Sequence, residues 1–485
     1  MGFLSLILIT PVIGALIIAF MPPHKSLLIR RTTVGVSALV LILSFSLLLV
    51  FDASSPEFQL VELKPWNPEL GSHYALAMDG LALPMVLLAT LLSFIAILAS
   101  YNMTDRPKGY NIAMLVLECG VLGVFMAEDW ALFYVFWELT LIPMFFLIDQ
   151  WGGKRRQMAS LNFVLYTMGG SVFMLVSLLI IYTSSSEHST TIAAMTQAAS
   201  QMPLDKQILV FLGLLIGFGV KVPIFPLHGW LPLAHVEAPS PVSILLSGIL
   251  LKMGAYGLIR AIGMLPDAAL ALQPLLAGLA LFSIVYGGLL AWRQSDLKAM
   301  IAYSSISHMG IVILGISALN EAGFLGATMQ MIAHGLVAGS LFLLIGLLYD
   351  RTHSREVADY SSLVQVMPKF ALFTTLALLA SIGLPGLVGF PAELHALIGS
   401  FERWGWWVLL VSLGVVISAA YAMRTIVRLF TGPVRPEMRA LKDLHGTELA
   451  SAGVLAFGII ALGLMPASAL ELFGAYVISL SAGFP

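Results

Sequence analysis

The sequence has 485 residues, of which 59% are hydrophobic and 10% are charged, and its formal net charge is −2. An ordinary soluble domain is nearer half apolar and a quarter charged. These proportions, with a mean hydropathy of +0.95, exclude a soluble globular fold and indicate a polytopic membrane protein. The lack of a basic surplus argues against a nucleic-acid partner. The only cysteine in the sequence, Cys119, excludes a disulfide, a CxxC motif, a thiolate zinc site and a cysteine-held iron–sulfur cluster within this chain.

Fourteen stretches of the sequence are long and apolar enough to cross a membrane, which needs about 20 mostly apolar residues. They cover residues 3–20, 33–51, 79–101, 110–127, 129–148, 160–182, 207–236, 240–263, 270–292, 299–318, 322–349, 369–399, 404–430 and 448–480. The first lacks the charged start and A-x-A cleavage site of a signal peptide, so we expect it to remain as a helix. The longest connections, 52–78 and 183–206, leave room only for a surface hairpin or a small helix. We therefore predict an all-α polytopic membrane protein with about 14 transmembrane helices.

The basic residues test this count, because Lys and Arg gather in the cytoplasmic connections of membrane proteins. Successive connections between membrane-spanning helices lie on alternate sides of the membrane. On this basis, 18 of the 24 Lys and Arg residues fall on the side opposite the N-terminus, and four fall on the side of the N-terminus. The 18 are Lys25, Arg30, Arg31, Arg106, Lys108, Lys154, Arg155, Arg156, Arg293, Lys298, Arg351, Arg355, Lys369, Arg424, Arg428, Arg435, Arg439 and Lys442, and the four are Lys64, Lys206, Arg260 and Arg403. This split predicts that both termini lie on the non-cytoplasmic side.

Two of the stretches, 207–236 and 369–399, are too long for one straight span and contain prolines. The first includes KVPIFPLHGW, which begins at Lys221, and the second includes LPGLVGFPAEL, which contains Glu393. A proline ring removes a helical hydrogen bond, so both stretches are predicted to be discontinuous helices of the kind that transporters place near the midplane. Because the breaks are five helices apart, we predict two five-helix repeats of inverted topology, each with one proline-broken helix. The predicted units are 1–109 (three N-terminal helices), 110–263 (helices 4–8), 270–430 (helices 9–13) and 431–485 (a C-terminal helix and tail).

Ionisable residues inside these spans are functional candidates, since a charge in hydrocarbon costs at least about 2.5–3.5 kcal/mol. Glu138 lies midway along the fifth stretch, Lys221 opens the first break, and Lys252 lies about 18 Å into the eighth helix. The remaining candidates are His308, His334 and Glu393 on later helices. Their similar depth predicts a connected polar axis, along which neutral histidine passes protons because it both accepts and donates. We expect Glu138 to pair with Lys221 and to control the charge that Lys252 experiences.

Other polar residues carry weaker signals. His228, His235 and Glu237 are near one another in sequence, but their spacing is loose and Pro232 intervenes, so a metal site is disfavoured. His395 lies two residues beyond the glutamate of the second break, about 200° around a regular helix, and a packed or lipid-facing imidazole is the favoured interpretation. The glycine-rich segments follow helices rather than strands, so no dinucleotide-binding loop is predicted.

Six segments of the sequence form a combination of motifs that is highly specific. They read YVFWELTLIP, KVPIFPLHGWLPLAHVEAP, LLKMGAYGLIR, KAMIAYSSISHMG, QMIAHGL and YDRTHSR. With them the chain resembles the antiporter-like subunit M, or chain 4, of complex I, a family that includes the D chain of the NAD(P)H-quinone oxidoreductases of cyanobacteria and plastids. The similarity runs through essentially all the predicted helices.

The resemblance implies a proton channel in the membrane arm of an NAD(P)H- or ferredoxin-quinone oxidoreductase. The family's proton-translocating residues fall on Glu138, Lys221, Lys252, His308, His334 and Glu393. NAD(P)H or ferredoxin, flavin, iron–sulfur clusters and a quinone such as plastoquinone would belong to other subunits, and this chain would hold no cofactor or metal. Its partners would be other membrane-arm subunits, including neighbouring antiporter-like ones, within a bacterial inner membrane or a cyanobacterial thylakoid.

The sequence departs from the family pattern in several places. Leu233 stands where the WLPDAH motif has an aspartate, Gly229 replaces the usual threonine, Glu118 is an added acidic residue, and Pro391 and His395 flank the terminal glutamate. These changes leave the axis intact but suggest a specialised paralogue, and a cyanobacterial variant devoted to CO2 uptake stays open. The alternatives are a D-type subunit of a multisubunit cation/proton antiporter, which the WELTLIP and GLPG segments disfavour, and a purely structural scaffold.

Overall fold

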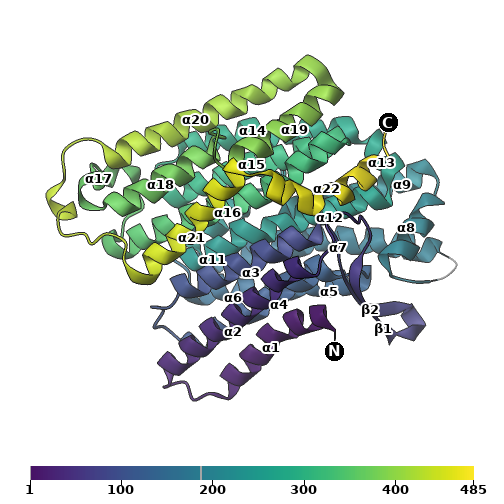
Figure 1. Cartoon of the computed structure of the whole chain (residues 1–485), viewed down its shortest axis with the longest axis horizontal. Helices are drawn as coiled ribbons and strands as arrows, with labels where there is room; N and C mark the ends of the chain where they lie inside the picture. Colours follow the sequence, from purple (N-terminus) through teal and green to yellow (C-terminus); the bar gives the residue numbers. More distant parts are fainter. Residues whose placement is uncertain (1, 186–187) are drawn as a thin grey trace.

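Helices make up almost the whole protein. The computed structural model describes residues 2–185 and 188–485, and Figure 1 shows the long helices running side by side along the long axis of the molecule. Within these residues, twelve helices are long and apolar enough to cross a membrane, and the shorter apolar helices Pro368–Ser381 and Ala467–Ser481 accompany them. The chain is therefore a mostly helical, polytopic protein of the membrane type, as its composition predicts.

The helices follow the predicted stretches closely. In the first half they are α1 (Phe3–Phe20), α2 (Ser26–Ser46), α3 (Ala82–Ala99), α4 (Pro107–Met126), α5 (Trp130–Leu139), α6 (Leu141–Trp151), α7 (Arg156–Ser184), α9 (Leu204–Lys221), α10 (Leu231–Glu237), α11 (Ser240–Leu245), the π-helical segment η3 (Leu246–Leu250) and α12 (Leu251–Met264). In the second half they are α13 (Pro266–Ala271), α14 (Gln273–Arg293), α15 (Leu297–Ala318), α16 (Glu321–Thr352), α17 (Leu363–Val366), α18 (Pro368–Ser381), α19 (Gly389–Trp404), α20 (Leu409–Phe430), α21 (Gly446–Leu464) and α22 (Ala467–Ser481). Both stretches predicted to be discontinuous are interrupted, between α9 and α10 and between α18 and α19.

Two connections carry additional secondary structure at the end of the molecule that holds both termini (Figure 1). Residues 52–78 include an antiparallel hairpin of β1 (Gln59–Asn67) and β2 (Ser72–Met78), and residues 183–206 include α8 (Ile192–Ser200). The carboxylate of Glu62 in β1 accepts hydrogen bonds from the backbone N–H groups of Leu4 at 2.7 Å and Ser5 at 3.1 Å. Because these N–H groups have no partner within the first turn of a helix, the contact fastens the hairpin to the start of α1.

The C-terminal segment differs from the prediction. The stretch 448–480 was expected to form one helix, but the structure has two, α21 and α22, separated at Met465 and Pro466. A proline disfavours helical backbone at the residue before it, and Met465 accordingly has a non-helical ψ of 61°. The chain turns here, and α22 packs against α3 and α16.

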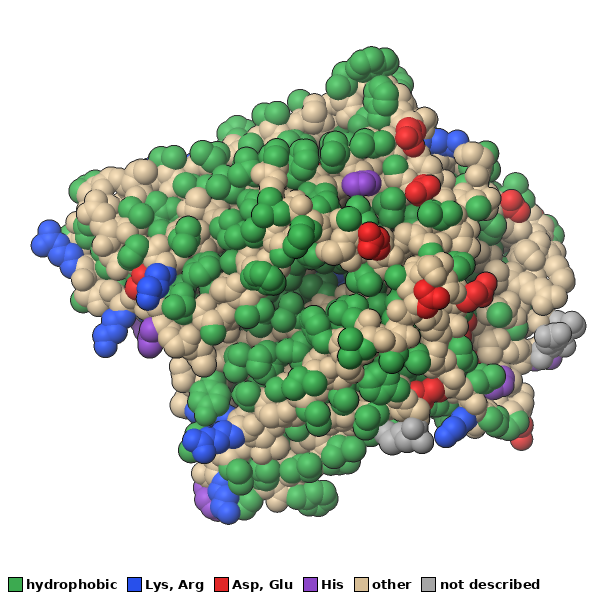
Figure 2. Space-filling model, viewed as in Figure 1, with side chains coloured by type: hydrophobic (Ala, Val, Ile, Leu, Met, Phe, Trp, Pro, Cys, Tyr) green, Lys and Arg blue, Asp and Glu red, His purple; other side chains and the backbone are tan. Residues whose placement is uncertain are grey.

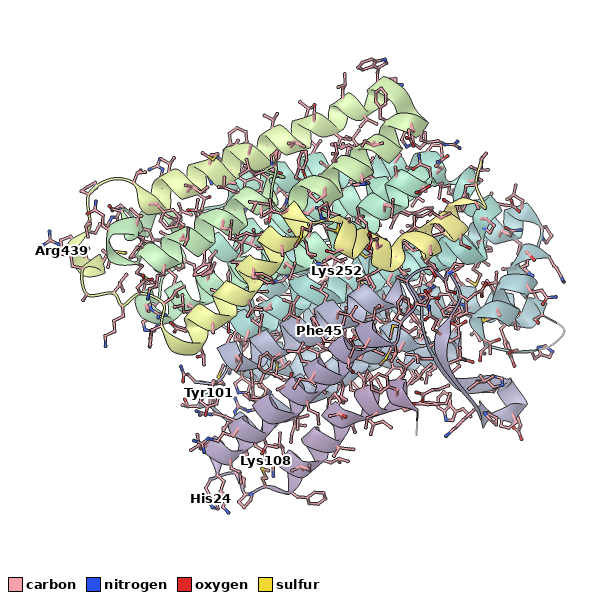
Figure 3. The ribbon with its side chains drawn as sticks, viewed as in Figure 1. His24, Phe45, Tyr101, Lys108, Lys252 and Arg439 are labelled. Atoms are coloured by element: carbon pink, nitrogen blue, oxygen red, sulfur yellow. The ribbon has the colours of Figure 1, made fainter. Side chains whose placement is uncertain are left out.

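Charged side chains divide between the two ends of the helices. Figure 2 shows most Lys and Arg side chains at the left end and most Asp and Glu side chains towards the right. Figure 3 labels Lys108 and Arg439 at that left end. We call this end the basic face, and the opposite end, which holds both termini, the terminal face.

The terminal face contains a buried ion pair between Asp79, just before α3, and Arg260 of α12. Nη1 and Nη2 of Arg260 lie 2.6 and 2.8 Å from the two carboxylate oxygens, and the guanidinium also donates to the hydroxyls of Tyr256 and Tyr476. Glu128, between α4 and α5, is close to this group; burial raises the pKa of its carboxyl to about 8, and the charge of Arg260 partly opposes that rise. Removing one partner of a buried pair typically costs about 3–5 kcal/mol, so this contact fixes the end of α12.

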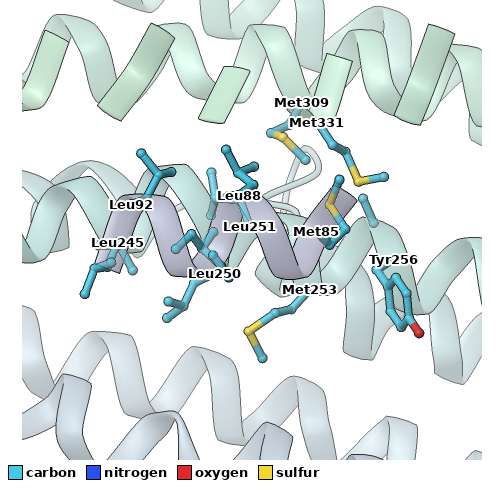
Figure 4. Packing of buried hydrophobic residues seen from close by; sticks show 14 of the residues in the cluster. Met85, Leu88, Leu92, Leu245, Leu250, Leu251, Met253, Tyr256, Met309 and Met331 are labelled. Atoms are coloured by element: carbon cyan, nitrogen blue, oxygen red, sulfur yellow. The ribbon is translucent and has the colours of Figure 1, made fainter. Parts of the chain in front are cut away.

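The centre of the protein is an apolar core in which α3 lies against α11, η3 and α16. Figure 4 shows three α3 side chains that pack there, namely Met85, Leu88 and Leu92. Gly248 of η3 and Gly335 of α16 meet at a close crossing, where a Cβ on Gly335 would lie 3.0 Å from the carbonyl oxygen of Gly248. The crossing brings His334, the residue before Gly335, towards the start of α12.

Candidate functional site

Lys252 lies at the centre of the site and is fully buried. It follows η3 as the second residue of α12, and π-helical segments within α-helices often occur at functional sites. Its Nζ donates to the carbonyl oxygen of Ser247 at 2.7 Å and lies 2.6 Å from Nδ1 of His334 in α16. This geometry allows the ammonium of Lys252 to donate directly to a neutral His334 imidazole.

Two histidines continue the contact from Lys252 to the second break. The ring centroids of His334 and His308 are 5.6 Å apart. Nε2 of His308 lies 2.9 Å from the carbonyl oxygen of Ser381, the last residue of α18. The structure therefore brings Lys252, His334 and His308 together, as predicted, and connects them to the point where the second discontinuous helix is interrupted.

Glu393 belongs to the same group of residues. It is the fifth residue of α19 and is buried, with 8% of its surface exposed. Gly383, two residues beyond Ser381, has a φ of +70°, and a Cβ at this position would lie 2.5 Å from Oε2 of Glu393. Only glycine combines this backbone conformation with such a close approach, so Gly383 makes the space in which the carboxylate sits.

The first break holds Lys221 against α5 and α6. Lys221 is the last residue of α9; its Nζ donates to Oγ1 of Thr140 at 3.1 Å and lies 3.9 Å from the ring centroid of Trp137. The carbonyl end of a helix and the face of an indole ring both favour a cation. Thr140 separates α5 from α6, three residues before Pro143. The proline predicted this loosening of the helix, but nothing in the sequence singled out Thr140 and Trp137 as partners of the lysine.

The structure does not show the expected pair of Glu138 and Lys221 as a direct contact. Among the described residues Lys221 contacts Trp137 and Thr140, and Oε1 of Glu138 is buried without a hydrogen-bond partner. Residues three apart share one face of a helix, so Trp137 and Thr140 both turn towards Lys221, whereas Glu138 lies about 100° away. Glu138 is partly exposed, and its charge still acts on Lys221 across the gap.

Two further residues of interest lie apart from this group. Nδ1 of His395 lies 2.7 Å from the carbonyl oxygen of Pro391, one turn earlier in the same helix, so the ring contacts its own backbone. Glu118 of α4 is buried, and its Oε1 accepts a hydrogen bond from Ser37 of α2 at 3.3 Å. Its Oε2 has no hydrogen-bond partner, so among the described residues no hydrogen bond joins this carboxyl to the predicted site residues.

A cavity of about 1190 Å³ opens at the basic face beside α10, α11, α15 and α16. Its polar lining includes Glu237, Ser240, Lys298, Asp350 and Arg355. It lies between the helices of the first break and the helices that carry the histidines. The site thus has a polar cavity on the side of the basic face, while the Asp79–Arg260 pair occupies the terminal face.

Donors from three segments hold the carbonyl end of α10 at this cavity. Nζ of Lys298 donates to the carbonyl of Ala238 at 2.7 Å, and Nη1 of Arg355 donates to the carbonyl of Val236 at 2.5 Å. The carboxylate of Glu237 accepts hydrogen bonds from the backbone N–H of Arg155 at 2.9 Å and from its Nε at 3.2 Å. Cations are favoured at the carbonyl end of a helix, so Lys298 and Arg355 fix the end of α10.

Comparisons with known proteins show the family to which the chain belongs. The family model described as NADH:quinone oxidoreductase/Mrp antiporter, TM, matches residues 127–418, a range that contains all six predicted site residues. The chain is 41% identical over 483 residues to NAD(P)H-quinone oxidoreductase chain 4 2 of Thermosynechococcus vestitus, and the alignment covers 97% of this chain and 90% of that one. The chain belongs to this family. It is also 41% identical over 473 residues to NAD(P)H-quinone oxidoreductase chain 4 1 of a Picosynechococcus species, with coverage of 94% and 87%.

Solved structures show that the family's fold occurs in more than one assembly. The chain matches a chain of respiratory complex I from Thermus thermophilus with a TM-score of 0.91 and 30% identity, covering 99% of this chain and all of that one. It matches a chain of the Mrp complex from Dietzia sp. DQ12-45-1b with a TM-score of 0.84 and 24% identity, covering 98% of this chain and 52% of that one. The fold is common to both, so the fold alone does not separate a redox-driven subunit from an antiporter subunit.

Proposed function

We propose that the chain is a proton-translocating membrane-arm subunit of an NAD(P)H- or ferredoxin-quinone oxidoreductase. The observation that carries this proposal is the buried contact path from Lys252 through His334 and His308 to the second break, where Glu393 lies. Ionisable groups are expensive in a membrane interior and generally mark ion or proton pathways. The curated relatives at about 40% identity are chains of NAD(P)H-quinone oxidoreductases, which favours a redox-driven assembly.

The chain crosses the membrane 14 times in this proposal. Twelve crossings correspond to the twelve long apolar helices, and α9 with α10 forms a thirteenth. One of the twelve, Gly389–Phe430, divides at Gly405 into α19 and α20, which belong to separate crossings and so give a fourteenth. The segments from α4 to α12 and from α14 to α20 form two inverted five-helix repeats, each containing one interrupted helix. The basic face is cytoplasmic, as the distribution of Lys and Arg favours, and both termini are on the opposite side.

The first break controls the path through its charge. Lys221 is held by Thr140 and Trp137, and Glu138 balances part of its charge from a partly exposed position that a neighbouring subunit can reach. If that neighbour moves Glu138, the positive charge of Lys221 acts more strongly on Lys252. At an effective dielectric constant of about 20, two charges about 8 Å apart interact by roughly 2 kcal/mol, enough to bias the direction in which a proton leaves Lys252.

The redox chemistry belongs to partner subunits. They supply NAD(P)H or ferredoxin, flavin, iron–sulfur clusters and a quinone, plastoquinone in a thylakoid, while this chain contributes the proton path and no cofactor. Its partners are other membrane-arm subunits, including neighbouring antiporter-like subunits, in a bacterial inner membrane or a cyanobacterial thylakoid. Glu118 and the other departures from the family pattern favour a specialised form of the complex, for which CO2 uptake is a candidate role.

Replacing Lys252 tests this function. In the purified complex reconstituted into proteoliposomes, we expect Lys252→Met to abolish proton translocation, because methionine has a similar length but carries no proton. Lys252→Arg should also impair it, since a guanidinium hardly releases its proton. Wild-type proton translocation in both variants would refute the role of Lys252.

Purification separates this function from that of a cation/proton antiporter subunit. A tagged chain should copurify with subunits that hold iron–sulfur clusters, and its proton translocation should require quinone reduction. Proton exchange driven by a cation gradient, in a complex without iron–sulfur clusters, would favour the antiporter instead.

A further inference from the structure

The first break contains a cluster of aromatic rings against which Lys221 lies. Trp137 is fully buried and stacks on Phe133, with ring centroids 5.7 Å apart and an interplanar angle of 27°. Phe218 of α9 meets the same indole edge-on, at 5.6 Å and 76°, and lies three residues before Lys221. The two phenylalanines hold the indole in place, and the ammonium of Lys221 lies 3.9 Å from its ring centroid.

Packing does not explain why the residue at this position is a tryptophan. Nε1 of Trp137 is buried and has no hydrogen-bond partner among the described residues. Buried polar groups are nearly always hydrogen-bonded, and a phenylalanine here would supply a flat ring without an unpaired N–H. What tryptophan adds is a stronger attraction for a cation, since its ring face binds cations better than that of any other aromatic side chain. The ammonium of Lys221 therefore accounts for the indole.

The second partner of Lys221 selects the same charged form. The hydroxyl of Thr140 donates its hydrogen to the backbone carbonyl oxygen of Trp137 at 2.8 Å. Its Oγ1 is thereby left to accept the hydrogen bond from Nζ of Lys221 at 3.1 Å. Neither this oxygen nor the ring face donates a hydrogen bond to a neutral amine. Together they form a site for the ammonium of Lys221.

Glu138 competes for the same ammonium from another side of α5. It is the next residue after Trp137, about 100° around the helix, and it is the charged side chain that acts on Lys221 electrostatically. Its Oε1 is buried without a hydrogen-bond partner among the described residues. Because lysine has a flexible four-carbon stem, its ammonium can change partner by rotation of side-chain bonds. Thus α5 offers one lysine two partners, an aromatic ring and a carboxylate.

The end of α9 that carries this cluster packs closely against α12. A Cβ on Gly257 of α12 would lie 2.3 Å from Cε1 of Phe218, and a Cβ on Gly254 would lie 2.9 Å from the backbone nitrogen of Val222. These glycines follow Lys252 by five and two residues. The position of the Lys221 ammonium therefore determines the charge presented to the helix that carries Lys252.

We propose that Trp137 is a positioning residue for Lys221. Its indole face holds the ammonium apart from Glu138, in the state in which the positive charge acts most strongly on Lys252. Pairing with Glu138 is the alternative state, and the balance between ring and carboxylate sets how often Lys252 experiences that charge. The step is a side-chain rotation in which no covalent bond forms or breaks. The inference rests on the proposed function and assigns a further residue to the control exerted by the first break.

Fluorinated tryptophans placed at residue 137 by nonsense suppression test this role in the reconstituted complex. Fluorine withdraws electron density from the ring face and weakens its attraction for a cation, while the ring keeps nearly the same size. We expect proton translocation coupled to quinone reduction to fall about twofold for each fluorine, from one to three, because Lys221 then pairs more often with Glu138. A tryptophan that served only for packing would tolerate the whole series.

Trp130 is the matched control for this series. It lies seven residues earlier in α5, is equally buried, and contacts the same Phe133, at 5.1 Å and 70°. Its Nε1 is also without a hydrogen-bond partner, but among the described residues no Lys or Arg lies over its ring. Fluorinated tryptophans at residue 130 should leave proton translocation unchanged. A decline at residue 137 alone supports the role of Trp137, whereas no decline, an increase, or an equal decline at both positions overturns it.

Ordinary substitutions extend the series. Phenylalanine keeps a weaker ring face and leucine keeps none, so we expect Trp137→Phe to lower proton translocation about threefold and Trp137→Leu at least about tenfold. Trp130→Phe should remain within about twofold of wild type. Equal effects of Trp137→Phe and Trp130→Phe would contradict the proposal. If Trp137→Leu fails to assemble, the fluorinated series decides, because those rings are nearly the same size as the native one.

The result for Lys252→Met keeps this inference distinct from the proposed function. If Lys252→Met abolishes proton translocation while fluorination at residue 137 has no effect, the function stands and Trp137 is not a positioning residue. If Lys252→Met translocates normally while fluorination at residue 137 alone lowers translocation, the proposed path fails and the role of Trp137 stands.

Discussion

The two interrupted helices hold opposite charges at opposite kinds of helix end. Lys221 closes α9 at the carbonyl end, whereas Glu393 lies near the amino end of α19. The partial negative charge at the carbonyl end of α9 favours the cation of Lys221, whereas Glu393 lies beyond the first turn of α19, where the helix dipole contributes little. The second break is hydrogen-bonded through Ser381 to His308, but among the described residues no hydrogen bond joins Lys221 to Lys252. Contacts therefore lead from Lys252 through the two histidines to the second break, whereas we propose that the first break acts on Lys252 through charge.

The largest effect should come from removing the charge at the first break. We expect Lys221→Ala and Glu138→Ala each to reduce proton translocation and the coupled quinone reduction at least about tenfold. The first variant loses an interaction of about 2 kcal/mol with Lys252, and the second leaves that interaction permanently unbalanced, so neither can switch it. Assembly should survive, since neither side chain joins helices through an ion pair. Lys206→Ala, in the exposed first turn of the same helix, is the control and should behave as wild type. Normal coupled activity in either test variant would contradict control by charge.

A smaller effect should come from the backbone of the second break. Gly383 and Gly386 both have positive φ, but only a Cβ on Gly383 would meet Glu393; one on Gly386 would have Leu464 at 3.8 Å as its nearest neighbour. Alanine at either position strains the backbone by about 1–2 kcal/mol. Gly383→Ala should also displace the carboxylate and lower proton translocation about fivefold, whereas Gly386→Ala should lower thermal stability only. Equal transport in the two variants would show that the position of Glu393 is unimportant.

The smallest effect on proton translocation concerns the end of α12, the helix that carries Lys252, where the expected change is in stability. The raised pKa of Glu128, about 8 against an ordinary value of 4.5, means that the unfolded carboxyl ionises while the folded one stays protonated. Stability therefore falls as pH rises from about 4.5 to 8, and Glu128→Gln should avoid this loss. The variant should match wild type in apparent melting temperature near pH 4.5 and exceed it at pH 9, by the equivalent of about 1–3 kcal/mol. A pH-independent difference would show that Glu128 does not titrate in this way.

The sequence was sufficient for much of the fold. Hydropathy located the long helices because apolar length is a requirement of crossing a membrane, and prolines located both breaks because the ring removes a helical hydrogen bond. It also predicted that Lys252, His308 and His334 would lie together, since they occur at similar depths. The turn at Pro466 was missed because the residues on both sides are equally apolar, so hydropathy shows no boundary.

The side-chain contacts of the site could not be predicted in the same way. The pairing of Lys221 with Thr140 and Trp137 rather than Glu138 depends on which face of α5 turns towards α9, and hydropathy along a uniformly apolar helix does not reveal this. For His235 the sequence suggested only a poor metal site, whereas the structure stacks its ring on Phe342 of α16. The cavity at the basic face is likewise formed by segments distant in sequence, which the order of residues does not disclose.

The central claim is that protons travel the connected path and leave at the second break through Glu393. The most direct test is proton translocation by Glu393→Gln in proteoliposomes, measured beside His395→Ala. Glutamine keeps the size and polarity of the side chain but cannot exchange a proton at neutral pH, and His395 contacts only the backbone of its own helix among the hydrogen bonds of the described residues. We predict that Glu393→Gln reduces proton release at least about tenfold and that His395→Ala retains more than half of it. Undiminished proton release by Glu393→Gln would contradict the account and place the exit elsewhere.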